Sequence, residues 1–335
     1  MKKLPARTAI AAAILLLLVL SAASPNLCTA QSEIDQVHIT PLLPHSVVSP
    51  DAALNTHTNP IKVDVSLVLV PVTITDARER LIVGLKPKDF EVFDGKSRQE
   101  IRHFSSEDGP ISLGVILDLS GSMNSKIERA REAVLAFLKS ANPQDEFFLI
   151  TFADRPQLLT DFTNSVEDVQ AQLLYTIPKG RTALLDAIYM GVTKMRQAKY
   201  SKRALLIISD GGDNHSRYTE RDIRSLVKEA DVMLYGVGIY DRTFATTEER
   251  FGPLLLSDIT EITGGRTFTI DNPNYLPAVA KLVGAQLRNQ YVIGYRPENA
   301  PRDGKWHKIK IKLRALKGLP PLHVAAKMGY YAPPQ

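Results

Sequence analysis

Oxygen-bearing side chains occur in three short groups in the middle of this 335-residue chain. The groups are Asp118–Ser122 (DLSGS), Gly180–Thr182 (GRT) and Ser209–Asp213 (SDGGD), and none of them contains histidine or cysteine. Hard oxygen donors suit magnesium, calcium or manganese rather than zinc or copper. The residue types therefore predict a divalent-metal site. Its predicted ligands are Asp118, Ser120, Ser122, Thr182 and Asp210.

The predicted ligand set contains two carboxylates and three neutral hydroxyls. Positions 118, 120 and 122 can point together if the chain leaves a strand as a loop, and Gly121 permits that turn. A dication held by so few carboxylates keeps residual positive charge, so it can accept a further carboxylate. The expected cofactor is a divalent cation, with Mg²⁺ ahead of Mn²⁺ or Ca²⁺. The expected partner is a protein that offers an aspartate or glutamate.

Alternating strands and helices are needed to position these groups. Apolar runs at 111–117 and 205–209 read as buried strands, and they end at Asp118 and Asp210. Further strands are expected at 147–152, near Leu158, at 232–237 and at 266–270. Helices are expected at 125–138, 166–174, 184–195, 223–230, 254–263 and 276–287, the first opened by a capping box at Ser125-Lys126-Ile127-Glu128.

This alternation predicts a doubly wound α/β domain with a mainly parallel sheet covered by helices on both faces. Ligands of open α/β sheets bind beyond the carboxyl ends of the strands. Asp118 and Asp210 lie at such ends directly, and Thr182 needs only a loop folded over the same edge.

The two flanks of this domain have β patterns. Alternation runs through 61–74, with a phase switch near Leu67 that indicates a bulge or a strand covered on both faces, and short strands follow near 90–93 and 101–104. The tail adds strands at 291–295 and 306–314. Neither flank has enough strands alone. We therefore expect the N-terminal segment, 61–107, to pack with the C-terminal segment, 290–335, as one β-module.

The strand expected at 306–314 has one basic and one apolar face. Lys308, Lys310 and Lys312 alternate with Ile309 and Ile311. The favoured interpretation is an edge strand whose lysines block aggregation. The alternative is a footprint for an anionic surface.

The N-terminus predicts export. Lys2, Lys3 and Arg7 precede an apolar run at 9–20, and Cys28-Thr29-Ala30 offers a small-residue cleavage site before Gln31. The run is shorter than the ~20 residues of a spanning helix, which disfavours an uncleaved anchor. We expect residues 1–30 to be a signal peptide and 31–60 a proline-punctuated flexible linker. The mature chain would have no membrane span and would be periplasmic, envelope-bound or secreted.

Composition argues against nucleic acid as a partner. The net charge is +5, and the expected signal peptide contributes three positive residues and no acid, which leaves 38 − 36 = +2. No clustered basic helix, aromatic RNA-binding stretch or Cys/His finger supports nucleic-acid binding. The single cysteine, Cys28, lies in the expected signal peptide.

The three groups closely resemble the metal-ion-dependent adhesion site of von Willebrand factor type A domains. The family pattern is Asp-x-Ser-x-Ser, then a threonine, then an aspartate, and here it is complete and in order. The resemblance covers about residues 111–289, and the domain is expected over residues 109–289. It implies that the serines and the threonine bind the metal, and that the aspartates bind it directly or through water. One departure is Arg181, which places a cation where many relatives have glycine.

The flanks resemble those of exported bacterial proteins with a von Willebrand factor A-related domain, of the type common in Acidobacteria. The segments that carry this likeness are 63–76, Asp89-Phe90-Glu91-Val92 and 290–331. The resemblance implies a non-enzymatic binding or adhesion module.

Two other classes of function remain open. A structural envelope protein would associate through its β-module rather than through the metal. A metal-dependent hydrolase or phosphatase would use Asp118, but Ser120 stands where haloacid dehalogenase-like phosphatases have a second acid. The sequence also lacks a phosphate-binding Walker loop and a nucleophile elbow, and no histidine lies within the three groups to serve as a base.

Overall fold

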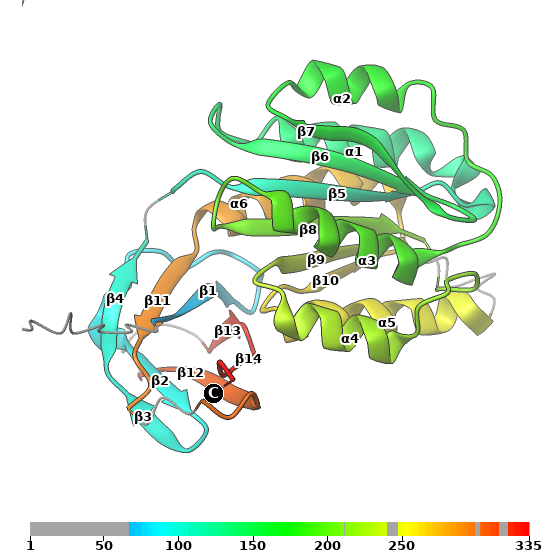
Figure 1. Ribbon diagram of the computed structural model, residues 1–335. Helices are drawn as coiled ribbons and strands as arrows, with labels where there is room; N and C mark the ends of the chain where they lie inside the picture. Colours follow the sequence, from blue (N-terminus) through cyan, green and yellow to red (C-terminus); the bar gives the residue numbers. More distant parts are fainter. Residues whose placement is uncertain are drawn as a thin grey trace, which may run out of the picture. The chain divides into compact units, whose positions relative to one another are not determined.

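The computed structural model describes residues 67–106, 108–210, 212–239, 247–298, 302–314 and 321–334 (Figure 1). The expected signal peptide, the expected linker, residues 61–66 and Gly211 of the third group lie outside the described residues. Within the described ranges, no helix is both long and apolar enough to cross a membrane.

A six-stranded sheet carries the three groups of polar residues. Its strand order is β10-β9-β8-β5-β6-β7; the first five strands are parallel, and β7 is antiparallel to β6 at one edge. The strands are β5 (Ser112–Asp118), β6 (Glu146–Phe152), β7 (Pro156–Thr163), β8 (Arg203–Ser209), β9 (Met233–Ile239) and β10 (Thr267–Ile270). Because β5 and β8 are adjacent, with Leu117 opposite Ile208, Asp118 and Asp210 leave the same edge side by side.

Helices cover both faces of this sheet (Figure 1). Two helices and the short α2 pack on one face in a core that includes Val115, Phe137 and Val283, and three helices pack on the other in a core that includes Ile116, Ile188 and Ile259. The first set is α1 (Ile127–Leu138), α2 (Val166–Leu173) and α6 (Leu276–Arg288); the second is α3 (Leu184–Lys194), α4 (Glu220–Glu229) and α5 (Thr247–Ile262). The predicted doubly wound, mainly parallel α/β fold is confirmed.

The entry into α1 differs from the predicted capping box. Residues Gly121–Ser125 form a 3-10 helix, η2, and Lys126 is the residue that caps α1, without a side-chain cap bond. The Lys126 amide donates to the carbonyl of Met123 instead. The expectation for Ser125 was wrong because the 3-10 turn itself leads the chain into α1, so no serine cap is required.

The two flanks form two four-stranded antiparallel sheets, which together we call the β-module. Their orders are β13-β1-β11-β4 and β14-β12-β2-β3. The strands are β1 (Val68–Asp76), β2 (Phe90–Asp94), β3 (Ser97–Gln99), β4 (Ile101–Ser105), β11 (Tyr291–Tyr295), β12 (Trp306–Leu313), β13 (Leu322–Ala326) and β14 (Gly329–Tyr331). Short 3-10 helices occur at η1 (Pro87–Asp89), η3 (Met195–Gln197) and η4 (Pro273–Tyr275). Each sheet contains strands from both flanks, which confirms the predicted β-module beside the α/β sheet.

Strand β1 lies inside its sheet, and its second half, from Val72 to Asp76, is buried on both faces. Val70, Val72 and Ile74 are fully buried in the core of the β-module, while Thr73 and Thr75 are 2% and 3% exposed on the opposite face. The first half of β1 lacks this double cover, because Leu69 is 47% exposed, so burial on both faces does not account for the switch in hydrophobic phase near Leu67.

Strand β12 has two neighbouring strands, each paired with a different part of its length. It pairs with β2 through residues 309–313 and with β14 through residues 306–308. Lys308, Lys310 and Lys312 are exposed along its outer face, and the Lys312 ammonium lies 5.0 Å from the centre of the Phe93 ring. The edge-strand interpretation was wrong for residues 306–308, which the three-residue β14 covers, whereas residues 309–313 pair with β2 and with no second strand among the described residues.

Candidate metal centre

Asp118 is the last residue of β5 and is fully buried. One carboxylate oxygen accepts from the Ser120 amide at 2.7 Å, and the other accepts from the Ser209 hydroxyl at 2.5 Å. Burial, with the nearby charge of Asp210, raises the pKa of Asp118 to about 6 despite these bonds. The charged carboxylate is therefore costly in the protein alone, and a cation beside it would offset that cost.

A short chain of hydrogen bonds joins the first and third groups. The Ser120 and Ser122 hydroxyl oxygens are 3.1 Å apart, and the Ser122 hydroxyl donates to Asp210 at 2.8 Å. Ser120 and Asp210 are each 1% exposed. The structure thus brings four of the five predicted ligands, Asp118, Ser120, Ser122 and Asp210, into one connected cluster at the edge of the sheet.

Thr182 reaches the same edge through its backbone. The Gly121 amide donates to the Gly180 carbonyl at 3.1 Å, and the Lys179 amide donates to the Leu119 carbonyl at 2.8 Å. The Thr182 amide donates to the side-chain oxygen of Asn214 at 3.0 Å. Thr182 is only 6% exposed, and no described residue forms a hydrogen bond with its hydroxyl. That hydroxyl is a donor atom still available to a ligand.

Gly180 gives this loop its shape. Its φ is +87°, a conformation that favours glycine, and a Cβ at this position would come within 2.7 Å of the Asp154 carboxylate. Asp154 in turn accepts from the Arg181 amide at 2.9 Å. The exposed Arg181 guanidinium lies 3.3 Å from Nδ1 of His215. A basic rim therefore borders the threonine loop.

Two further acids near the cluster have structural partners. Asp213 accepts from the Leu185 amide at 3.3 Å and from the Ser216 hydroxyl. Asp186, in the first turn of α3, accepts from the amides of Arg217 and Tyr218 at 2.9 and 3.1 Å. These contacts tie the loop after β8 to the start of α3, as expected for acids at a helix N-terminus.

Lys126 is a member of the cluster that sequence reasoning missed. Its ammonium is 2.5 Å from the second carboxylate oxygen of Asp210, and its side chain is only 16% exposed. The available signal was a lysine directly before a helix, where the helix dipole disfavours a cation. A basic residue at such a place indicates a nearby acid that compensates it.

The residues present fit a hard dication. The cluster offers carboxylate and hydroxyl oxygens, and the Thr182 hydroxyl has no described partner. No group of three or more His, Cys, Asp or Glu side chains in the described part of the chain is arranged to hold a metal ion. A metal here would therefore depend on hydroxyl donors as well as on the two carboxylates, an all-oxygen set of donors that suits a divalent cation.

Comparison with known proteins identifies the domain. Residues 113–212 match the von Willebrand factor type A domain family. Human inter-alpha-trypsin inhibitor heavy chain H4 is 26% identical over 145 residues, which cover 38% of this chain and 16% of that protein. The chain thus spans about a sixth of the length of this relative and of its bovine counterpart, where the share is 17%.

Solved structures with similarity include a von Willebrand factor type A protein from Catenulispora acidiphila and a mussel protein. The first is 13% identical, with a TM-score of 0.46, and the match covers 77% of this chain and 73% of that one. The second is proximal thread matrix protein 1 from the mussel byssus, described with a zinc-occupied adhesion-site motif; it is 18% identical, with 58% and 49% covered and a TM-score of 0.46. The present chain therefore contains a von Willebrand factor type A domain, matched over residues 113–212.

Proposed function

We propose that this chain is an exported protein-binding module that holds a divalent cation, Mg²⁺ in the first place, at Asp118, Ser120, Ser122, Thr182 and Asp210. The cation would attract a carboxylate from an aspartate or glutamate of a protein partner. The chain's own residues would hold the ion, orient its open side and exclude bulk water. The family match supports an interaction module rather than an enzyme.

The observation that carries this proposal is the pair of buried carboxylates at neighbouring strand ends. Asp118 and Asp210 are 0% and 1% exposed, and they are linked through the Ser120 amide and the Ser120 and Ser122 hydroxyls. Two buried acids destabilise a fold unless cations or strong donors compensate them. Lys126 compensates one charge. A divalent metal ion would more than compensate the remaining negative charge and would use the oxygen atoms that converge there.

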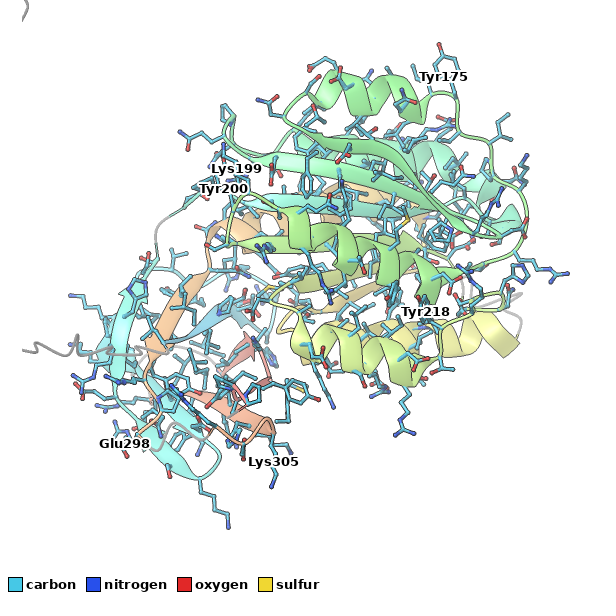
Figure 2. The ribbon with its side chains drawn as sticks, viewed as in Figure 1. Tyr175, Lys199, Tyr200, Tyr218, Glu298 and Lys305 are labelled. Carbon is cyan, nitrogen blue, oxygen red and sulfur yellow. The ribbon has the colours of Figure 1, made fainter. Side chains whose placement is uncertain are left out.

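A protein partner is favoured by exposed apolar residues in the segment that leads from α2 to Thr182. The segment between α2 and Thr182 exposes Leu174, Tyr175 and Ile177 at 65%, 84% and 74%, and Tyr175 projects away from the ribbon (Figure 2). Three large apolar side chains this exposed within four residues are typical of a surface that another protein covers.

Export is the second part of the proposal. The basic start, apolar run and small-residue site at 1–30 support a signal peptide, and the mature chain would begin near Gln31. Sequencing the N-terminus of native material tests this directly. Recovery of Met1 with the apolar run intact would contradict export by cleavage.

The test of the metal is calorimetric titration of Mg²⁺ or Mn²⁺ into wild type, Asp118→Ala and Thr182→Ala. We expect Asp118→Ala to abolish binding, because it removes one of only two anionic ligands, and the α/β domain to stay folded. Thr182→Ala removes one neutral oxygen and should weaken binding more mildly. Equal affinity in wild type and Asp118→Ala would show that this cluster is not the metal site.

The partner is tested by a pull-down from the native envelope with and without chelator. A metal-bridged partner should be lost in chelator and with Asp118→Ala. A partner that remains in both conditions would favour assembly through the β-module instead.

A further inference from the structure

Lys126 is an unusual neighbour for a metal centre. It lies at the junction of η2 and α1, eight residues after Asp118, and its side chain is turned into the cluster with 16% exposure. Its ammonium contacts Asp210, whose side chain is 0% exposed, at 2.5 Å. This places a permanent positive charge among the atoms proposed to attract a dication.

Lys126 changes the net charge that the cluster would have with a metal ion bound. Asp118 and Asp210 contribute two negative charges and Lys126 one positive charge, so the protein groups carry one net negative charge. A dication turns that sum to one net positive charge, and one carboxylate from outside returns it to zero. Without the lysine, a dication alone would neutralise the two aspartates. Net charge in a buried site is costly, so the lysine creates a need for one external anion.

We propose that Lys126 leaves the metal-loaded centre with one net positive charge, and thereby makes it selective for a partner's carboxylate. This inference rests on the proposed function and names the device that sets its selectivity. Lys126 is a positioning residue: it touches Asp210, and through Asp210 it acts on the ion and on the acid that the ion attracts.

Hydrogen bonds around the aspartates agree with this role. Asp210 uses one oxygen for Ser122 and the other for Lys126. Asp118 likewise uses one oxygen for the Ser120 amide and the other for Ser209. Each carboxylate thus has both oxygens held by the protein, which limits how much negative charge either can turn toward an ion. Neutral hydroxyls from Ser120, Ser122 and Thr182 are left to complete the ligand set.

A simpler alternative is that Lys126 only stabilises the fold by pairing with a buried acid. The two ideas predict different changes in metal affinity when Lys126 is lost. If Lys126 were only a structural support for Asp210, its loss would leave metal affinity equal or lower. If it withholds charge from the centre, its loss must raise metal affinity, because a cation that repels the dication is gone.

The experiment compares Lys126→Gln with wild type by calorimetric titration of Mn²⁺. The matched control is Lys139→Gln, the same substitution at the exposed C-terminal cap of α1. We expect Lys126→Gln to bind Mn²⁺ about tenfold more tightly, a conservative figure for one charge acting on a dication. Lys139→Gln and the charge-conserving Lys126→Arg should both match wild type. Equal or weaker binding by Lys126→Gln would overturn the inference.

A second readout follows the external anion, with acetate as the probe carboxylate. Acetate is titrated into each Mn²⁺-loaded protein while water-proton relaxation reports the water bound to the ion. In wild type and Lys139→Gln, acetate should displace that water, and in Lys126→Gln the displacement should require several-fold more acetate. The same acetate dependence in all three proteins would contradict the proposed selectivity.

The outcomes separate the two proposals. If wild type binds no dication, the proposed function fails, and the inference fails with it. If wild type binds Mn²⁺ and Lys126→Gln binds no more tightly, only the inference fails. Should Lys126→Gln unfold in chelator because Asp210 loses its buried partner, it is refolded with Mn²⁺ present, and Lys126→Arg tests separately whether charge or shape matters.

Discussion

At the scale of single residues, the centre is made of side chains that are unfavourable one by one. Asp118 is an ionisable group at the end of a buried strand, and burial raises its pKa to about 6. Lys126 is a cation at a helix N-terminus. Gly180 has a left-handed backbone conformation. Residues that oppose the stability of a fold and yet converge at one edge of a sheet are typical of a site built for binding.

Gly180 allows a test at this scale. Alanine there would combine a positive φ with a Cβ 2.7 Å from the Asp154 carboxylate, so the loop that carries Thr182 must shift. We expect Gly180→Ala to cost about 1–3 kcal/mol of stability and to weaken Mn²⁺ binding several-fold. Urea unfolding and calorimetry measure the two effects.

Gly84 supplies the matched control for this substitution. Its φ is +83°, but nothing lies within 4 Å of the Cβ that alanine would add. Gly84→Ala should therefore lose about 1 kcal/mol of stability for its backbone conformation alone, with metal affinity unchanged. If Gly84→Ala and Gly180→Ala reduce metal affinity alike, the loop geometry at Gly180 has no role in binding.

At the scale of elements, the sequence predicts those features of the fold that are set by residues adjacent along the chain. The strands ending at Asp118 and Asp210 are continuous apolar runs, and their central place in a parallel sheet follows from that composition. The contact between Lys126 and Asp210 joins residues 84 positions apart, and nothing in the local pattern around either one encodes it. The same limit applied to β12, whose second neighbour, β14, is three residues long.

The β-module gives a prediction at this scale. Strand β1 pairs with β11 on one side and β13 on the other, and β2 pairs with β12. Deleting residues 290–335 removes these partners, so residues 67–105 should become sensitive to proteases, since isolated hairpins are marginal in water. Deleting only residues 327–335 removes β14 and spares β1, and should leave that segment protected. Equal protection in both truncations would show that the N-terminal strands are stable without β11 to β13.

At the scale of the described fold from Leu67 onward, polar side chains connect the β-module with the α/β sheet. Gln290, 2% exposed, donates to the Thr73 hydroxyl at 3.3 Å and lies 3.5 Å from the Tyr235 hydroxyl. Arg266, beside β10, forms a two-point ion pair with Glu79 in the turn after β1. A buried amide network and a bidentate pair fix one arrangement better than apolar contact alone, because each donor must meet its acceptor. We therefore expect the two parts to unfold together.

Tyrosines in and beside this junction predict how stability depends on alkaline pH. Burial raises the pKa of Tyr235 to about 12, and burial together with the shared neighbour Asp94 raises the pKa values of Tyr295 and Tyr330. A group with a raised folded pKa stabilises fully below its unfolded pKa, near 10 for tyrosine, and loses that contribution as pH rises through the folded pKa. Stability should therefore fall above about pH 10, by about 1.4 kcal/mol per pH unit for each tyrosine that stays protonated in the fold.

One lysine makes stability change with pH in the opposite direction. Burial lowers the pKa of Lys202 to about 8, so between about pH 8 and 10.5 the unfolded chain binds more protons and stability rises with pH. We thus expect stability to reach its maximum at about pH 10 and then to fall, because several tyrosines outweigh the single lysine. Urea unfolding across this range measures the curve for wild type and for the double variant Tyr295→Phe/Tyr330→Phe. The variant, which has no phenol to ionise at either position, should lose stability less steeply above pH 10, and equally steep curves would show that other groups control alkaline unfolding.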